Sequence, residues 1–186
     1  MIAGYRSKNH PRQVARRGAL DAVDDRQTPR EVVDAAAGLT GGAFTLDAAA
    51  SASNTQCPAF YSIADDGLRQ PWSGRVWCNP PYSNCASWVR KAWAEWDAGN
   101  VTAIAMLLPS NRTEQGWWQT LIEPRRDTTG SPLRVIFLPG RIRFARPQGW
   151  RAPKGDRPTF GACLLTWTRE PLTYPAPAPG LFEEPA

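Results

Sequence analysis

Histidine is almost missing from this 186-residue chain, and its scarcity excludes most imidazole chemistry. The single histidine, His10, lies in a stretch, residues 1–27, that lacks apolar periodicity and is predicted to be a disordered arm. Serine–histidine and cysteine–histidine nucleophilic sites, zinc–histidine sites and histidine general bases all need a histidine inside the folded domain. Any reaction that the chain catalyses must therefore proceed without imidazole.

Cysteine pairs and long apolar runs are missing as well. The chain has four cysteines without a C-x-x-C pair, which favours buried free thiols in a reducing compartment over zinc ligands or disulfides. No apolar run approaches the roughly 18 residues that a bilayer-spanning helix needs, and the N-terminal stretch has no apolar signal-peptide core. We therefore expect a cytoplasmic protein that has no membrane partner and no metal.

The charge that is present is mostly positive and unevenly placed. The net charge is +5, and residues 1–27 carry six Lys or Arg against three Asp, so the arm supplies +3. A basic arm on a mildly basic body suits a polyanionic partner, although the arm alone could equally be a solubilising tail. Residues 170–186 form a proline-rich, acidic tail without fold signals. One folded domain is therefore predicted over residues 28–169.

Within that domain, apolar runs alternate with helical periodicity, which predicts an α/β fold with a mostly parallel sheet flanked by helices. Residues 101–108 are apolar enough to be a central strand, and residues 159–167 are interpreted as an antiparallel strand at an edge. The other strands are predicted at 43–46, 59–63, 76–78 and 133–138, and the helices at about 29–40, 84–98 and 113–122.

Two helices carry more specific signals. Thr28-Pro29-Arg30-Glu31 matches a capping box, with Thr28 as the N-cap and Glu31 bonding back to the open amide. The second helix, capped by Ser83 or Asn84, has Trp88, Trp93 and Trp96 at helical spacing. These tryptophans favour packing against the sheet over stacking on bases. Arg90, Lys91 and Glu95 are predicted on the other face.

The stretch Val76-Trp77-Cys78-Asn79-Pro80-Pro81-Tyr82 looks like a buried strand that ends in a rigid polar loop. Two prolines force an extended, non-helical exit, which leaves the Asn79 amide and the Asn79 and Pro80 carbonyls free to face a ligand. Such acceptors could hold the hydrogens of a planar amino group, while Tyr82 stacks on its ring. Asn-Pro alone is also a common turn dipeptide.

Acidic residues follow two other predicted strands. Asp47 ends the first strand, where α/β sheets usually meet nucleotide-like ligands, and small alanines follow it. The glycine-rich dinucleotide fingerprint is absent, and Asp47 could instead cap a helix. Asp65 and Asp66 precede Gly67 after the second strand, where they indicate either a second ligand contact or an ordinary turn.

Basic residues gather late in the domain, with Phe144 and Trp150 interleaved, as in sites that bind nucleic acid. A solvated loop is the alternative. The basic side chains of this stretch include Arg141, Arg143, Arg151 and Lys154, and Arg112 follows the central strand.

Asn79-Pro80-Pro81-Tyr82 resembles the catalytic motif of amino-group methyltransferases that use S-adenosylmethionine. Residues 28–167 are similar to the small phage-type DNA N6-adenine methyltransferases. The resemblance rests on the ordered set Thr28-Pro29, Leu46-Asp47-Ala48-Ala49-Ala50, Asp66-Gly67-Leu68 with Trp72, the Asn79 loop, Leu107-Leu108-Pro109 and Gly140-Arg141-Ile142-Arg143-Phe144.

That resemblance implies a Rossmann-like fold and methyl transfer to adenine N6 in DNA, in the host cytoplasm if the gene belongs to a phage or prophage. It implies that Asn79, Pro80, Pro81 and Tyr82 are catalytic, with Tyr82 stacking on a flipped adenine. Thr28, Pro29, Asp47, Asp65 and Asp66 would contact the cofactor.

Target recognition is placed in the loops 123–132 and 141–158. Two alternatives remain: a methyltransferase for protein glutamine or RNA, and a nucleic-acid-binding module without activity.

Overall fold

The computed structural model describes residues 27–144 and 160–169. Nearly all of the predicted arm over 1–27, the basic residues Arg151 and Lys154, and the tail 170–186 lie outside the described residues. The elements in chain order are α3 (Arg30–Leu39), β1 (Leu46–Asp47), β2 (Ala59–Phe60), β3 (Gly74–Cys78), the 3₁₀ turn η1 (Tyr82–Asn84), α4 (Cys85–Asp97), β4 (Val101–Pro109), α5 (Gly116–Leu121), β5 (Leu133–Phe137) and β6 (Ala162–Thr168).

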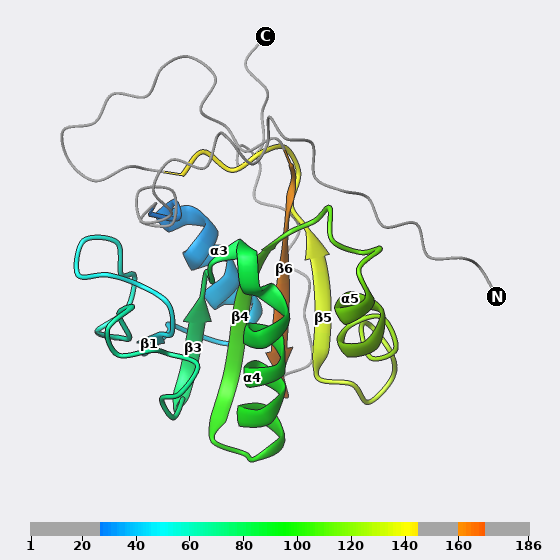
Figure 1. The fold of residues 1–186 in the computed structure, drawn as a ribbon, viewed down its shortest axis with the longest axis horizontal. Helices are drawn as coiled ribbons and strands as arrows, with labels where there is room; N and C mark the ends of the chain where they lie inside the picture. The colour runs from blue at the N-terminus through cyan, green and yellow to red at the C-terminus, as the bar shows by residue number, and fades with distance from the viewer. Residues whose placement is uncertain (1–26, 145–159, 170–186) are drawn as a thin grey trace, which may run out of the picture.

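Six strands form one mixed sheet in the order β2-β1-β3-β4-β6-β5 (Figure 1). β1 pairs in parallel with both β2 and β3, and β3 pairs in parallel with β4. β6 is antiparallel to both of its neighbours, so β5 points the same way as β4. The predicted α/β class is confirmed, and the arrangement is consistent with a Rossmann-like methyltransferase fold.

The antiparallel direction of the last strand is confirmed, but its predicted edge position is wrong. β6 lies between β4 and β5, and all seven of its residues are buried. A strand that is paired on both sides and covered on both faces can be almost continuously apolar, as this one is. The edge strand on this side of the sheet is β5, where Phe137 is 53% exposed.

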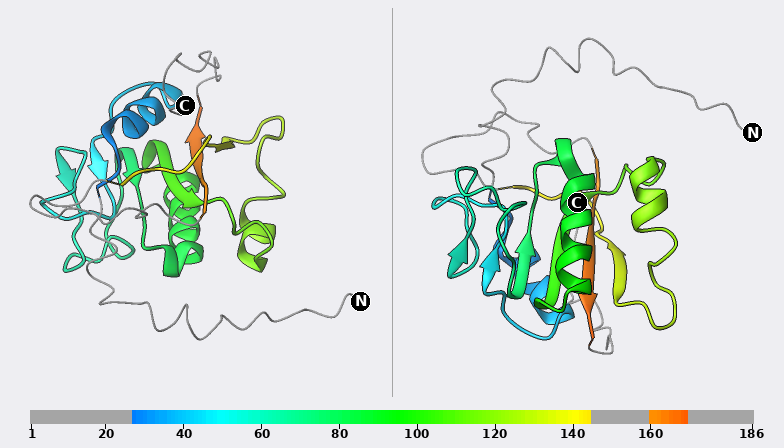
Figure 2. Two further views of the ribbon diagram at one scale, coloured as in Figure 1. Left: turned by 90° about the horizontal axis from the view of Figure 1, so that it is seen from above. Right: turned by 60° about the horizontal axis from the view of Figure 1, so that its bottom comes forward.

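The sheet separates two apolar layers, because successive side chains of a strand point to opposite faces. On one face, Val76 and Ile104 pack with residues of α4 and α5, whereas Trp77 and Leu107 pack with α3 on the other. Figure 2 shows α3 and α4 on opposite sides of the sheet. The predicted packing role of the α4 tryptophans is confirmed. The buried tryptophans of both layers are Trp72, Trp77, Trp88, Trp93, Trp96, Trp118 and Trp167.

Thr28 begins the folded region but does not cap α3, so the predicted capping box is wrong. The N-cap is Pro29, and no side chain makes a capping hydrogen bond there. Thr28 Oγ1 accepts a hydrogen bond from Asn79 Nδ2 at 3.2 Å, across 51 residues. The Thr28 hydroxyl therefore bonds Asn79 in the tertiary structure and does not make the helix cap that the local sequence predicts.

The predicted solvent position of Glu95 on α4 is also wrong. Glu95 is 6% exposed, and its carboxylate pairs with Lys91 at 2.5 Å and accepts from Asn100 Nδ2 at 2.6 Å. Burial raises the pKa of Glu95, but the hydrogen bonds from Lys91 and Asn100 outweigh it and leave the pKa below its ordinary value. The carboxylate is thus an internal anchor between α4 and the turn before β4. At the other end of α4, Asn84 occupies the cap position without a side-chain capping bond.

Three elements are shorter than predicted. β1 and β2 contain two residues each, and α5 covers 116–121 where 113–122 was predicted. Backbone hydrogen bonds still tie the continuing chain together, with Tyr61 N donating to the Asp47 carbonyl at 2.9 Å. Within the described residues, no helix combines the length and apolar character needed to cross a bilayer.

Candidate active site

The candidate site lies where the strand order reverses. From β1 the chain first adds β2 on one side and then returns to place β3 on the other side of β1. In open α/β sheets, ligands bind beyond the carboxyl ends of the strands at such a switch point. Asp47 ends β1 and pairs in register with Trp77, two residues before Asn79. The fold therefore brings the two predicted centres, Asp47 and Asn79, to one edge of the sheet.

Asn79 leaves β3 with its side chain half-buried and held on one side only. Its Nδ2 donates to Thr28 Oγ1, whereas its Oδ1 is buried and has no hydrogen-bond partner among the described residues. Buried acceptors are nearly always satisfied, because an unpaired one costs free energy. An Asn79 oxygen without a donor, at the ligand-binding edge of the sheet, is suited to accept a hydrogen bond from a bound substrate.

The prolines give this loop its shape. Pro80 is buried, and Pro81 is extended with φ −54° and ψ 118°. The Pro81 carbonyl accepts from Asn84 N at 3.0 Å, which closes the η1 turn directly before α4. The predicted extended, non-helical exit from the strand is confirmed.

Tyr82 begins the η1 turn, and its half-buried ring packs beside the core residues of the α4 face. It meets the ring of Phe160 edge-on, with centroids 5.8 Å apart and planes at 69°. Sequence reasoning missed Phe160, which lies two residues before β6, because only the reversal of β6 brings that end of the strand to the Asn79 edge. Stacking of Tyr82 on a base stays a prediction.

Asp47 is 2% exposed, and two backbone amides hold its carboxyl group. Oδ1 accepts from Ala49 N at 3.4 Å and Oδ2 from Gln56 N at 3.2 Å. Burial raises the pKa of Asp47 to about 6, and these two bonds lower it only in part. Asp47 caps no helix, because the chain from Ala48 to Pro58 forms a loop; the carboxyl group organises that loop at the end of β1.

Gln56 also belongs to the site, although sequence reasoning did not single it out. Its backbone N–H bonds Asp47, and its side-chain Nε2 donates to the Thr28 carbonyl at 2.9 Å. An isolated glutamine in a polar loop carries no local signal of such a role. Hydrogen bonds thus connect Asn79, Thr28, Gln56 and Asp47 in one chain of contacts.

Asp65 and Asp66 occupy a turn after β2. Asp65 is exposed and accepts from Ser62 N and Oγ at 2.8 and 2.6 Å, and these bonds lower its pKa. Asp66 has a positive φ of 56° and pairs with Arg69 at 3.2 Å. These contacts are those of a turn, and a cofactor contact from either residue stays a prediction.

Gly67 fixes that turn against the end of β1. A Cβ at this position would lie 2.1 Å from the Ala48 carbonyl oxygen and 3.2 Å from Trp88. The Gly67 carbonyl accepts from Trp72 Nε1 at 2.9 Å. The Asp66-Gly67 turn is therefore packed directly beside the residue that follows Asp47, and only glycine permits that approach.

The residues predicted to contact nucleic acid differ in their exposure. Arg141 and Arg143 are exposed, whereas Ile142 and Phe144 between and after them pack on the α3 layer. Phe144 is therefore a packing residue and not a stacking platform. In Figure 1 this segment runs from the end of β5 toward α3, along the edge to which the parallel strands point. The alternation leaves two basic side chains facing outward near the candidate site.

Arg112 and the loop 123–132, also predicted to contact DNA, lie at opposite ends of the strands. Arg112 is half-buried, and its Nε has no hydrogen-bond partner in the described part of the chain. The loop 123–132 leads into the amino end of β5, at the edge of the sheet opposite Asn79 (Figure 1). Its Arg125 stacks on Trp93 at 4.4 Å and its Arg126 pairs with Glu123. That position disfavours the predicted role of this loop in target recognition.

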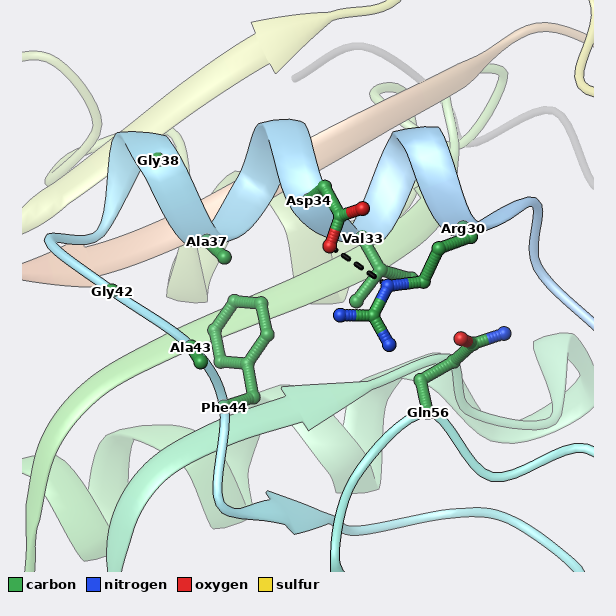
Figure 3. Close-up of a pocket in the computed structure, with 9 residues that line it drawn as sticks. All are labelled: Arg30, Val33, Asp34, Ala37, Gly38, Gly42, Ala43, Phe44 and Gln56. Carbon is green, nitrogen blue, oxygen red and sulfur yellow. Dashed lines mark hydrogen bonds and ion pairs between the residues drawn. The ribbon is translucent and has the colours of Figure 1, made fainter.

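Three further features lie outside this chemistry. The four cysteines are buried and free, as predicted. Residues 27–144 and 160–169 contain no group of three His, Cys, Asp or Glu that could hold a metal ion. A small cavity of about 140 Å³ lies between α3 and the chain around Phe44, with Arg30, Asp34 and Gln56 at its margin (Figure 3). It contains neither Asp47 nor Asn79.

Comparison with known proteins now adds to this geometry. The family model described as DNA N-6-adenine-methyltransferase (Dam) matches residues 19–169. The chain belongs to this family. Asp47, the Asn79 loop and Arg141 to Phe144 all lie within the matched region. The predicted family is thereby confirmed.

A curated relative, the DNA N-6-adenine-methyltransferase of Escherichia phage T1, is 43% identical over 98 residues. The match covers 50% of this chain and 39% of the relative. The chain therefore matches less than half of the length of that Dam-family protein, so activity and substrate have to be argued from the site itself.

Proposed function

We propose that the protein is an S-adenosylmethionine-dependent DNA adenine-N6 methyltransferase that acts on a flipped-out adenine. The observation that carries the proposal is the buried, unpartnered Oδ1 of Asn79 at the switch point of the sheet. Membership of the Dam family supports adenine N6 as the acceptor.

Asn79 and Pro80 prepare the acceptor nitrogen. The lone pair of an exocyclic amino group is delocalised into the ring, so the nitrogen is a poor nucleophile. Asn79 Oδ1 accepts one amino hydrogen and the Pro80 carbonyl accepts the other, which draws the nitrogen toward tetrahedral geometry. Fixed acceptors of this kind lower the barrier because they need no reorganisation during the reaction.

Tyr82 holds the base in place. Stacking on an aromatic ring contributes about 1–3 kcal/mol per base, and flipping a base from a duplex costs a few kcal/mol. The stacking energy is therefore of the size needed to offset much of the flipping cost. Because the Tyr82 ring rests edge-on against Phe160, its position is already restrained before a base arrives.

The residues present fit the cofactor. Asp47 offers a buried carboxylate at the end of β1, Thr28 and Pro29 lie at the Asn79 side, and the Asp65-Asp66 turn packs beside Ala48. When bound, S-adenosylmethionine supplies the electrophilic methyl group. Thr28 and Pro29 would hold its methionine end and Asp65 or Asp66 its adenosine, with Asp47 between them.

DNA would meet the edge that carries Asn79. Arg141 and Arg143 lie exposed near this edge, Arg112 follows β4 there, and Arg151 and Lys154 belong to the same basic stretch of the sequence. Their positive charges suit the phosphate backbone, which supplies sequence-independent affinity.

A direct test is to incubate the protein with labelled S-adenosylmethionine and separate pools of DNA, RNA and protein. DNA from the reaction is then digested to nucleosides, and we expect N6-methyl-2′-deoxyadenosine as the labelled product. Label in protein or RNA alone would indicate an amide or RNA methyltransferase. DNA binding without any transfer would indicate a binding module.

A further inference from the structure

Gln56 connects the two centres of the candidate site by separate groups. Its backbone N–H donates to Asp47 Oδ2 at 3.2 Å, and its side-chain Nε2 donates to the Thr28 carbonyl at 2.9 Å. In Figure 3 its side chain reaches from the loop toward the start of α3. The half-buried Gln56 thus contacts both the Asp47 carboxylate, which is proposed to bind the cofactor, and Thr28, which bonds Asn79.

Thr28 transmits this connection to Asn79. Thr28 is 3% exposed, lies just before α3 and accepts from Asn79 Nδ2 through its hydroxyl. The side-chain amide of asparagine can turn over, which exchanges its oxygen with its NH₂ group. Turned over, Asn79 would present donors to the donor hydrogens of an amino group. Because a threonine hydroxyl can donate as well as accept, the bond to Thr28 fixes where the Asn79 amide lies; in the orientation that the structure shows, it engages Nδ2 and leaves Oδ1 open to the substrate.

We infer that Gln56 is a positioning residue: its side chain holds Thr28 in place, and Thr28 in turn holds the Asn79 amide at the position from which Oδ1 reaches the acceptor nitrogen. The inference rests on the proposed function. The contact with Asp47 is made by the backbone of Gln56, so it persists whatever side chain stands at position 56. Loss of the side chain should therefore keep the contact with Asp47 and impair transfer more than it impairs cofactor affinity.

The test compares Gln56→Leu with Gln119→Leu. Gln119 is a matched control, because its Nε2 also donates to a backbone carbonyl, that of Thr113 at 2.7 Å, but on exposed α5. Small misplacements of catalytic groups cost up to about 100-fold in rate, so we expect Gln56→Leu to lower kcat roughly 10- to 100-fold. Its S-adenosylmethionine Kd, measured by calorimetry, should rise by a smaller factor than kcat falls, since the backbone bond to Asp47 is intact and only the Thr28 contact is loosened.

Two further variants separate positioning from general loosening. Gln56→Lys keeps a donor for the Thr28 carbonyl and should recover most of the lost kcat. Thr28→Val removes the acceptor of Asn79, so its effect and that of Gln56→Leu should not multiply in the double variant, because both act through one contact. Thr28→Val also tests the inference if Gln56→Leu does not fold. Multiplying effects, or equal kcat in Gln56→Leu and Gln119→Leu, would overturn it.

A readout without turnover keeps this inference distinct from the proposed function. The side-chain amide protons of Asn79, assigned in NMR spectra by their loss in Asn79→Ala, should shift and exchange faster in Gln56→Leu and not in Gln119→Leu. If the wild-type protein transfers no methyl group, the proposed function fails, while unchanged Asn79 signals would refute the role of Gln56.

Discussion

Asn79 shows how a single residue can be recognised by what it lacks. Its amide nitrogen is bonded to Thr28, and its buried oxygen has no partner in the described residues. Most buried side-chain acceptors are hydrogen-bonded, so an open one at the carboxyl ends of the parallel strands points to a ligand. An unpaired buried oxygen costs free energy, and a hydrogen bond from the substrate amino group would recover that cost.

Asn79→Ala should abolish methyl transfer, because it removes an acceptor that acts on the reacting nitrogen. We expect kcat to fall by at least about 100-fold, in line with the loss of one fixed transition-state hydrogen bond. The free energy of unfolding should fall by only about 0.5–1.5 kcal/mol, because the Nδ2 bond to Thr28 is lost while the deleted oxygen has no partner to lose. Single-turnover assays and urea unfolding measure the two effects. Retained activity would contradict the role of Asn79.

Asp47 makes cofactor affinity depend on pH. Burial raises the pKa of its carboxyl group to about 6 in the free protein, so the group is half-protonated near that pH. A cofactor that donates hydrogen bonds to the carboxylate favours the ionised form. Affinity should therefore be full above pH 7 and fall below pH 6, by at most about tenfold per pH unit.

Calorimetric titration from pH 7.5 to 5.5 measures this dependence. Asp47→Asn cannot ionise, so its affinity should be weak and nearly constant over the same range. A wild-type affinity that does not change with pH would argue against a contact between Asp47 and the cofactor.

Gly67→Ala should disturb the end of β1. The added Cβ would lie 2.1 Å from the Ala48 carbonyl oxygen, so the turn or the strand end must shift. Overpacking of this kind typically costs about 1–3 kcal/mol of stability. Gly38→Ala is the control, because nothing lies within 4 Å of its Cβ and alanine favours a helix. Thermal unfolding of both variants gives the comparison; an unchanged Gly67→Ala would mean that the turn yields easily.

At the scale of elements, α4 depends on a polar anchor as well as on its tryptophans. Glu95 lies inside, between Lys91 and Asn100, while Trp88, Trp93 and Trp96 pack on the sheet. A buried carboxylate is tolerated only because its oxygens are bonded. The hydrogen bond between Glu95 and Asn100 thus joins the last turns of α4 to the chain that enters β4.

Glu95→Gln should lower stability, because Lys91 would keep its half-buried charge without a counter-ion. We expect a loss of about 1–3 kcal/mol at pH 7. The pKa of Glu95 is lowered in the folded state, so its contribution is present above the ordinary Glu pKa and is lost as pH falls through the folded value. The difference from wild type in urea unfolding should therefore shrink in acid. Glu114→Gln, on an exposed side chain, should change little at any pH.

At the scale of the whole molecule, the segment from Arg141 to Phe144 follows β5 and brings basic side chains near the edge that carries Asn79. Arg141→Ala and Arg143→Ala should each weaken DNA binding at low salt. Each neutralised phosphate contributes about 0.9 to the slope of log K against log salt, so each variant should reduce that slope by about that amount. Arg90→Ala, exposed on α4, is the control and should leave the slope unchanged. Equal slopes in all three would place DNA elsewhere.

The fold could be predicted from the sequence wherever a local pattern is sufficient. The apolar run of β4, the helical spacing of the α4 tryptophans and the proline exit after Asn79 were each identified correctly. The errors at Thr28, Glu95 and β6 share one cause. Thr28 bonds a residue 51 positions away, Glu95 is buried beside Trp72, whose backbone bonds it, and β6 is placed by strand order; local periodicity contains none of these.

The amino-acid sequence by itself determined the α/β class and the family, and it predicts the chemistry of the Asn79 loop, because these depend on residue types in short, ordered runs. Only the tertiary structure decided that Asp47 and Asn79 share one edge, that Thr28 bonds the Asn79 amide, and that Gln56 bonds both Thr28 and Asp47. The parallel order β2-β1-β3, which places β1 between the two strands that follow it in the chain, creates these contacts. They arise from packing the sheet between its two apolar layers and not from any one segment.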